Sequence, residues 1–371
     1  MFLRPDDYII AMESTAACRQ YTLADMERMR DAGIGLISKQ VDWREIETAP
    51  GVYDWGRVDQ QVANARRAGM RYLLLTPGQE PPHFPVDWYA KSKDGILNGP
   101  AVTDEMIFRG QSHSPSQLSM WHDEAMAVED DFLRAFTARY RSPGVLFAYA
   151  VGGGEGFLPG GARAFMDRAA LDDFEVKHGC PLRIYNAQEA MHTRYLDAQT
   201  GQIVAWLNAR CLKTFCQKHA ILAKANPSRE IYVGLHEMLQ DFAGAWDSGV
   251  LLDPLYAGIR EAFGDPPIIS IHFTHHIHGL VWTVRFMQRM KRRGVHVFGG
   301  AEYCVGLAKH APVSAEDGSR LILGVKGDLS PNDEIEPWML DAIRDARAVL
   351  AQSEACAWKE LWEDADSDGS L

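Results

Sequence analysis

The sequence predicts an α/β protein built as a (β/α)8 barrel, the TIM-barrel fold. Short apolar runs rich in β-branched and aromatic residues alternate with longer helical stretches, and eight such runs can be counted. Alternating strand and helix units imply a parallel sheet with helical crossovers, and eight of them close naturally into a barrel. A doubly wound open sheet is the alternative, but no G-x-G-x-x-G nucleotide fingerprint follows the first run.

Each element follows from a local pattern of apolar residues and from residues that stop helices. Thr22 suits the N-cap of the first helix and Gly33 its end. The expected strands cover residues 8–12, 35–41, 71–76, 145–151, 231–235, 268–273, 295–298 and 321–325. The expected helices cover residues 22–32, 57–67, 123–140, 171–225 with a break near 179–181, 254–263, 280–293 and 337–352.

The elements belong to one expected domain over residues 1–360, because no shift in composition marks a boundary. Residues 77–120, rich in Pro, Gly and Ser, predict a long loop after the third strand, and a second long βα loop is expected at about 157–190. Long loops inside a compact domain are usually functional. Residues 361–371 predict an acidic, frayed tail.

Composition excludes several classes of function. The 38 basic and 50 acidic residues give a net charge of -12, and such a surface repels phosphate backbones, so we expect no nucleic-acid partner. No stretch approaches the roughly 18 apolar residues of a membrane span. The six cysteines form no C-x-x-C pair and the N-terminus lacks a signal-peptide pattern, so we expect reduced thiols in a cytoplasmic protein.

In a barrel of this kind the functional residues gather where the strands end. Carboxylates, imidazoles and aromatics dominate these positions, which is the composition of a carbohydrate site, since aromatic faces stack on sugars and carboxylates bind hydroxyls. The expected substrate-binding residues are Asp42, Trp43, Trp88, Trp121, His236, Glu237, His272, Tyr303 and Lys326.

Two glutamates stand out as candidates for catalysis. Glu155 follows the apolar run VLFAYAV through three glycines, and Glu302 follows VFGGA. An acidic residue at the end of a buried strand costs free energy unless it is paired or used, and a salt bridge to a neighbour is the structural alternative. The fourth and seventh strands are expected to face each other across the barrel mouth. Two carboxylates there could flank a glycosidic bond, one as acid and the other as nucleophile or base.

A metal site is the other possibility raised by the strand ends. His272, His275, His276 and His278 cluster after the sixth strand, but the Glu of an H-E-x-x-H zinc motif is missing. We therefore expect no metal and no cofactor.

A segment after the second strand resembles a known family. Val41–Glu47 (VDWREIE) followed by Pro50–Trp55 (PGVYDW) is similar to the second βα unit of clan A glycoside hydrolases, whose pattern is roughly W-x-x-[IL]-E-x-x-x-G-x-[YF]-[DN]-[WF]. Pro81-Pro82 with the Trp88 segment resemble a P-P-x-W loop after strand three, and residues 122–143 resemble the helix and turn that lead to the acid/base strand. The resemblance covers about residues 20–156, weakens beyond them, and is nearest to the family 42 β-galactosidase type.

The resemblance implies an acid/base at the end of strand four and a nucleophile at the end of strand seven, which carry onto Glu155 and Glu302. It implies a glycosidase that cleaves an oligo- or polysaccharide by a two-glutamate, retaining mechanism. The chain departs from the pattern at Gly154, where the clan has Asn before the acid/base, and it lacks the cysteine zinc cluster of many family 42 members.

Three alternatives stay open. The glycine-rich segment ending in Gly-Glu after strand four is also similar to β-amylase-type barrels, which invert. A barrel that binds glycan without cleaving it is compatible with Gly154. A non-glycosidase barrel, such as an aldolase or a metal-dependent hydrolase, is disfavoured by the lack of a convincing metal cluster or of a lysine inside a hydrophobic strand.

Overall fold

The protein is described from a computed structural model of the 371-residue chain. The structure describes residues 9–13, 20–41, 43–76, 81, 83–90, 118–149, 167–182, 198–225, 231–235, 261, 268–273, 297–301, 321–326 and 337–352.

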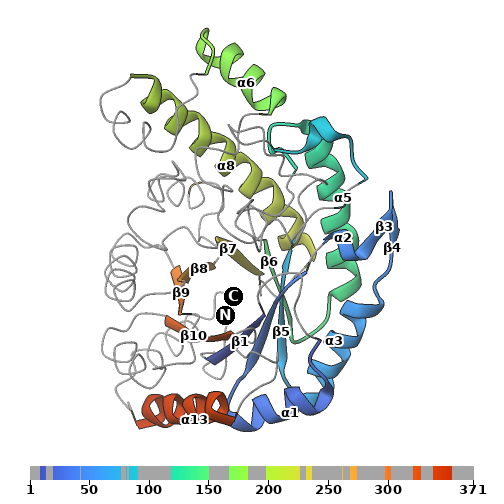
Figure 1. The fold of residues 1–371 in the computed structure, drawn as a ribbon, viewed down its shortest axis with the longest axis vertical. Helices are drawn as coiled ribbons and strands as arrows, with labels where there is room; N and C mark the ends of the chain where they lie inside the picture. The colour runs from blue at the N-terminus through green and yellow to red at the C-terminus, as the bar shows by residue number, and fades with distance from the viewer. Residues whose placement is uncertain are drawn as a thin grey trace.

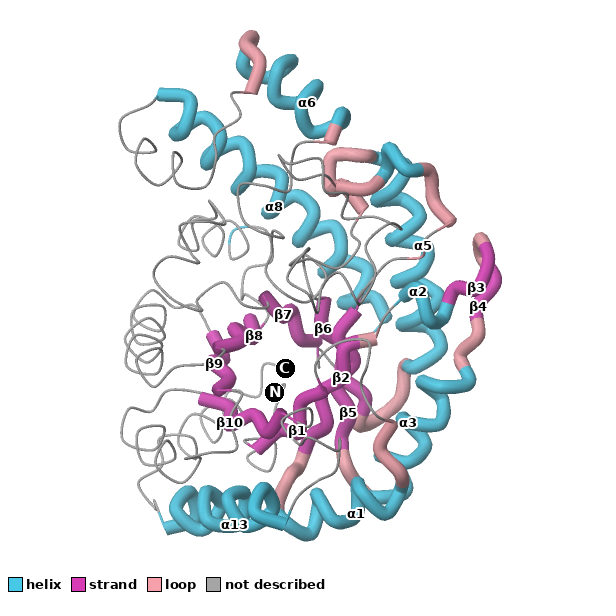
Figure 2. The backbone as a smooth tube through the Cα atoms, viewed as in Figure 1, coloured by secondary structure: helices cyan, strands magenta, loops and turns pink. Residues whose placement is uncertain are grey.

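Eight parallel strands close into a barrel, which confirms the predicted fold (Figures 1 and 2). Around the ring, each strand pairs with its two neighbours in chain order, and the last strand pairs with the first. The strands are β1 (Ile9–Glu13), β2 (Leu36–Gln40), β5 (Arg71–Thr76), β6 (Val145–Tyr149), β7 (Ile231–Leu235), β8 (Ile268–Phe273), β9 (Val297–Ala301) and β10 (Leu321–Lys326).

The seventh barrel strand, β9, differs most from its prediction, which placed it at residues 295–298. The predicted strand stops before the glycines, but Gly299 and Gly300 continue the ladder in register with both β8 and β10. Glycine tolerates extended backbone as well as turns, so it need not end a strand. The strand therefore continues to Ala301, the residue before Glu302.

The helices form outside the ring, and their ends follow the expected signals. Thr22 caps α1 through a reciprocal capping box with Asp25, and Gly33 ends it in the left-handed conformation. Gly179 likewise ends α6 in the left-handed conformation, which confirms the break predicted near residues 179–181. The described helices of four residues or more that follow barrel strands are α1 (Leu23–Ala32), α2 (Trp43–Ile46), α3 (Gly56–Ala68), α5 (Asp123–Tyr140), α6 (Arg168–His178), α8 (Ala198–Ala225) and α13 (Pro337–Gln352).

Two short elements among the described residues have no predicted counterpart. The hairpin β3 (Glu47–Ala49) and β4 (Val52–Tyr53) follows α2, and the 3-10 helix η2 (Val86–Trp88) lies within the predicted loop 77–120. Helix α6 matches the first part of the predicted helical region 171–225 and begins inside the loop expected at about 157–190. The predicted helix 280–293, most of 254–263 and the predicted tail lie outside the described residues.

The first and last of the described helices, α1 and α13, pack against each other. Helix α13 lies beside α1 (Figure 1), and a Cβ added at Gly33 would come within 2.4 Å of the Arg347 side chain. Gly33 also has a φ of 106°, so both the contact and the backbone favour glycine at this position.

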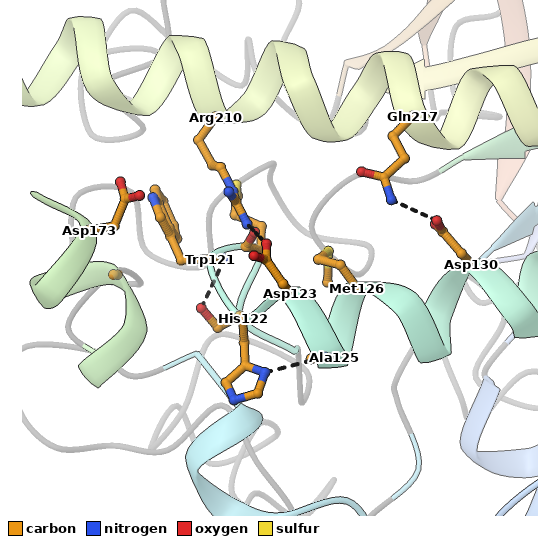
Figure 3. A network of polar contacts seen from close by, with 12 residues as sticks. Trp121, His122, Asp123, Ala125, Met126, Asp130, Asp173, Arg210 and Gln217 are labelled. Carbon is orange, nitrogen blue, oxygen red and sulfur yellow. Dashed lines mark hydrogen bonds and ion pairs between the residues drawn. The ribbon is translucent and has the colours of Figure 1, made fainter. Parts of the chain in front are cut away.

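Helix α8, the longest among the described residues, packs along α5 through a buried group of charges. The Lys218 ammonium is fully buried and lies 2.8 Å from the Glu129 carboxylate and 2.6 Å from that of Asp130. Gln217 donates a 2.6 Å hydrogen bond to Asp130 (Figure 3), and Arg134 pairs with the same carboxylate at 3.6 Å. Buried charges are tolerated only when paired, so this cluster fixes how the two helices align.

Among the helices of the described residues, none combines the length and the apolar character needed to cross a bilayer.

We expect Lys218→Met to lower the free energy of unfolding by about 3–5 kcal/mol, because it leaves two buried carboxylates without their cation. Urea denaturation followed by circular dichroism measures the change. Arg134→Met is the matched control: its side chain is 57% exposed, so the loss should stay below about 1 kcal/mol. A Lys218→Met loss no larger than that of the control would contradict the importance of the cluster.

Candidate active site

The barrel brings the ends of all eight strands to one face, where the polar residues predicted from the sequence belong. Strand β6 ends at Tyr149, ahead of Glu155 in the chain, and β9 ends at Ala301, directly before Glu302. In the ring, β7 and β8 separate these two strands. Both glutamates lie outside the described residues, as do Asp42, His236, Glu237 and Tyr303.

Two of the predicted ligands lie near the ends of described barrel strands. His272 is the penultimate residue of β8 and pairs in register with Gly300 of β9. Lys326 is the last residue of β10 and pairs with Met12 of β1. The ends of β8, β9 and β10 are therefore neighbours, and Glu302 follows the middle one in the chain.

Trp43 has a packing role, which corrects its prediction as a sugar-stacking residue. Its side chain is fully buried, and its ring stacks on Phe132 of α5 with centroids 4.6 Å apart. Helix α2 lies outside the ring of strands (Figure 2), and the indole also packs against Phe84, with ring centroids 5.3 Å apart. Its position just after a strand does not say toward which layer the side chain turns, and this is why the prediction was wrong.

Trp121 is likewise a packing residue. It is 7% exposed and stacks on Trp206 of α8, with ring centroids 4.4 Å apart. The indole is thus covered by another aromatic face rather than offered to a ligand. Trp88 differs: it is half-buried at the end of η2, stacked on Phe84 at 5.8 Å and against His122 at 5.1 Å.

Glu47 organises the motif after the second strand. It belongs to the quoted motif but is not among the predicted site residues. Its carboxylate is 2% exposed and accepts hydrogen bonds from the Trp43 indole N–H and the Gly51 backbone N–H. His83, which follows β5 in the chain, places its Nε2 atom 3.4 Å from Oε1 of Glu47. Glu47 thus joins helix, hairpin and loop, and the spacing of Trp, Glu and Gly in the motif was the available signal.

The same motif ends in aromatic residues that anchor it to α5. Tyr53 and Trp55 both pack near Phe132. Burial raises the pKa of the Tyr53 hydroxyl, and the nearby carboxylates of Glu47 and Asp131 raise it further. Tyr53 therefore stays neutral at physiological pH and serves as a packing residue.

Polar contacts at the surface join α3 to α5 beside this motif. Arg139 donates to Asp59, with Nε 2.9 Å from Oδ1, and its guanidinium lies over the Trp55 ring. The hydrogen bond from Arg139 lowers the pKa of the Asp59 carboxyl. Burial and the Asp59 carboxylate raise the pKa of the Tyr140 hydroxyl, which donates to Asp59. These groups stabilise the scaffold and have no place in the candidate site.

In the described part of the chain, His, Cys, Asp and Glu side chains do not gather in threes or more as a metal site would require. Of the histidine cluster after strand six, only His272 falls within that part.

Comparison with known proteins supports the resemblance over the first half of the barrel. Residues 15–151 match the sequence profile of glycoside hydrolase family 42, described as beta-galactosidase, and this stretch contains β2, β5 and β6. A beta-galactosidase of Thermus thermophilus is 35% identical over 105 residues, which is 28% of this chain and 16% of that protein. The chain thus matches only a small part of that relative's length.

Solved structures resemble the whole barrel. The catalytic domain of beta-amylase from Paenibacillus polymyxa aligns with a TM-score of 0.70 at 13% identity, covering 94% of this chain and 99% of that one. The beta-galactosidase of Marinomonas ef1 aligns with a TM-score of 0.61 at 13% identity, covering 95% of this chain and 61% of that one. At these identities the likeness establishes the fold alone.

Removing the Glu47 carboxylate should destabilise the protein, because it leaves the buried Trp43 indole N–H and the partly buried Gly51 N–H without their acceptor. We expect Glu47→Ala to cost about 2–4 kcal/mol of unfolding free energy. Glu45→Ala, which removes only a partly exposed ion pair with Arg57, should cost less than about 1 kcal/mol. Urea denaturation of both variants checks this, and equal losses would show that Glu47 does not organise the motif.

Proposed function

We propose that this chain is a glycoside hydrolase in which Glu155 is the acid/base and Glu302 the nucleophile. One observation carries the proposal: in a closed parallel barrel, the fourth and seventh strands end shortly before these two glutamates. The family 42 match over residues 15–151 supports it independently, because it includes the strand that leads to Glu155.

In the first step, Glu302 attacks the anomeric carbon while the bond from that carbon to the leaving oxygen breaks. The bonding electron pair passes to the leaving oxygen, which takes the proton of Glu155. The products of this step are the released alcohol, a glycosyl ester on Glu302 and an ionised Glu155. Protonation of the leaving oxygen matters most for poor leaving groups, whose alkoxides are strongly basic.

In the second step, Glu155 removes a proton from water, and the water oxygen attacks the anomeric carbon. The ester bond to Glu302 breaks, so its carboxylate is restored and Glu155 is protonated again. Two displacements give net retention, for which the carboxyl groups should be about 5–5.5 Å apart.

The substrate is proposed to be an oligo- or polysaccharide bound by hydroxyl ligands at the other strand ends. Those ligands are proposed to be Asp42, His236, Glu237, His272, Tyr303 and Lys326. Trp88, the one half-exposed tryptophan among the three predicted, remains a candidate for stacking on a sugar farther from the reacting bond. A β-D-galactoside is the first substrate to test, since the matched relatives are described as beta-galactosidases.

A glycan-binding barrel without hydrolytic activity is the second candidate. The observation that favours it is Gly154, where the clan has an Asn that holds the sugar 2-hydroxyl. Saturable glycan binding with no release of sugar from any substrate would favour this alternative.

Replacing either glutamate should abolish turnover of natural glycosides without unfolding the barrel. With a panel of 4-nitrophenyl glycosides and oligosaccharides, we expect Glu302→Gln to reduce kcat by about 10⁴-fold or more, because the nucleophile is lost. Glu175→Gln, which changes an exposed acid on α6, should leave kcat unchanged. Substantial activity of Glu302→Gln on the substrate that the wild type prefers would refute the assignment.

The stereochemistry of the product tests the role of Glu302. Proton NMR of the first sugar released from a β-glycoside should show the β-anomer before mutarotation, as a double displacement requires. Release of the α-anomer would instead mean that the water attacks directly, with Glu302 as base and the carboxyl groups roughly 6.5–9.5 Å apart.

A further inference from the structure

A short segment, Leu118–His122, is held at several independent points where the loop after β5 returns to α5. Leu118 forms an antiparallel bridge with Tyr89, and the Ser119 N–H donates to the Trp88 carbonyl at 2.7 Å. The His122 imidazole accepts the Ala125 N–H and so caps α5. The segment is therefore tied both to the η2 region and to the start of α5.

Helix α8 holds the same segment from the other side (Figure 3). The Trp121 ring stacks on Trp206, and Arg210 Nε donates to the Met120 carbonyl at 2.5 Å. Arg210 also pairs with Asp123 at 3.3 Å. The helices α5 and α8 are themselves joined by the buried Lys218 cluster. The segment Leu118–His122 is therefore held in place relative to both helices.

Ser119 connects the segment Leu118–His122 to Asp167, which follows β6 in the chain. Its hydroxyl donates to Asp167 Oδ1 at 2.8 Å, and both residues have no exposed surface. The same Asp167 oxygen accepts the Ala170 N–H at 3.0 Å and so caps α6, while Ser119 Oγ accepts the Trp121 N–H at 3.2 Å. A fully buried carboxylate in this position is favoured by the positive end of the α6 dipole and by its hydrogen bonds.

The place of Asp167 in the chain gives this contact its functional meaning. The chain between Tyr149, where β6 ends, and Arg168, where α6 begins, contains Glu155. One end of that stretch is held by the barrel, and the other ends at Asp167. Proton transfer to a leaving oxygen depends on the position of the acid, and an error of about 1 Å can cost roughly 100-fold in rate.

We propose that Ser119 and Asp167 are positioning residues for the general acid: their hydrogen bond fixes the far end of the stretch that carries Glu155. The inference rests on the proposed function of Glu155 and adds to it two residues that lie outside the strand ends. A contact that only stabilised the fold would affect all substrates alike, whereas a positioning contact should affect the acid-dependent step selectively.

The test compares two substrates that differ in their need for an acid. A 2,4-dinitrophenyl glycoside leaves without protonation, whereas a methyl glycoside of the same sugar does not; β-D-galactosides are the first pair, or the sugar preferred in the aryl-glycoside panel. In Ser119→Ala and Asp167→Ala, we expect kcat/KM for the methyl glycoside to fall about tenfold or more and that for the dinitrophenyl glycoside less than about twofold. Assays are run well below the Tm of every variant.

Two variants serve as controls. Asp167→Asn keeps an oxygen that accepts from Ser119 and Ala170, so it should restore most of the activity on the methyl glycoside. Thr137→Val removes another buried hydroxyl, whose 2.7 Å bond to the Leu133 carbonyl stays within α5. It should lower the Tm without changing the ratio of the two activities.

The outcomes separate this inference from the proposed function. Glu155→Gln should show the same selective loss in larger measure. If it does and Ser119→Ala loses both activities equally, the positioning role is overturned while the acid assignment stands. If Glu155→Gln shows no dependence on the leaving group, or the wild type hydrolyses neither glycoside, the acid assignment and this inference are both overturned.

Discussion

Closure of the parallel sheet is the constraint on which the rest of the structure depends. Every strand of the barrel is bonded on both edges, and β10 completes the ring by pairing with β1, so no barrel strand can slip without breaking two ladders. The strand ends are therefore fixed relative to one another, even though they come from Ile9–Glu13 at one extreme of the described chain and Leu321–Lys326 near the other. Such a frame can bring residues that are distant in sequence to the same face of the barrel.

Around the ring, polar contacts rather than apolar area alone define how the helices are aligned. Glu47 accepts hydrogen bonds from an indole and a backbone N–H, Lys218 lies between two carboxylates, and Asp167 caps a helix while bonding Ser119. Each group is buried, so each is costly if its partner is displaced. The family resemblance after β2 has the same basis, because its Trp, Glu and Gly form one hydrogen-bonded unit.

The strands and long helices could be predicted because each contains enough residues to show a period or an apolar run. The hairpin after α2 could not, because its second strand, Val52–Tyr53, is too short to carry a pattern. Trp43 was misassigned because the end of a strand gives no sign of whether the next side chain turns to the axis or to the helices. The bond between Ser119 and Asp167 joins residues 48 apart, a separation at which polar residues leave no periodic signal. The catalytic roles of Glu155 and Glu302 stay predictions.

Helix α13 packs on α1, and strand β10 pairs with β1. These contacts have a consequence for synthesis on the ribosome. The first strand can pair with the second early, but its other edge has no partner until Leu321–Lys326 has been translated. Nascent chains begin to fold from the N-terminus. The chain as far as Lys326 must therefore emerge before that edge is covered, and during this interval the edge is open to chaperones and to edge-to-edge association with other chains.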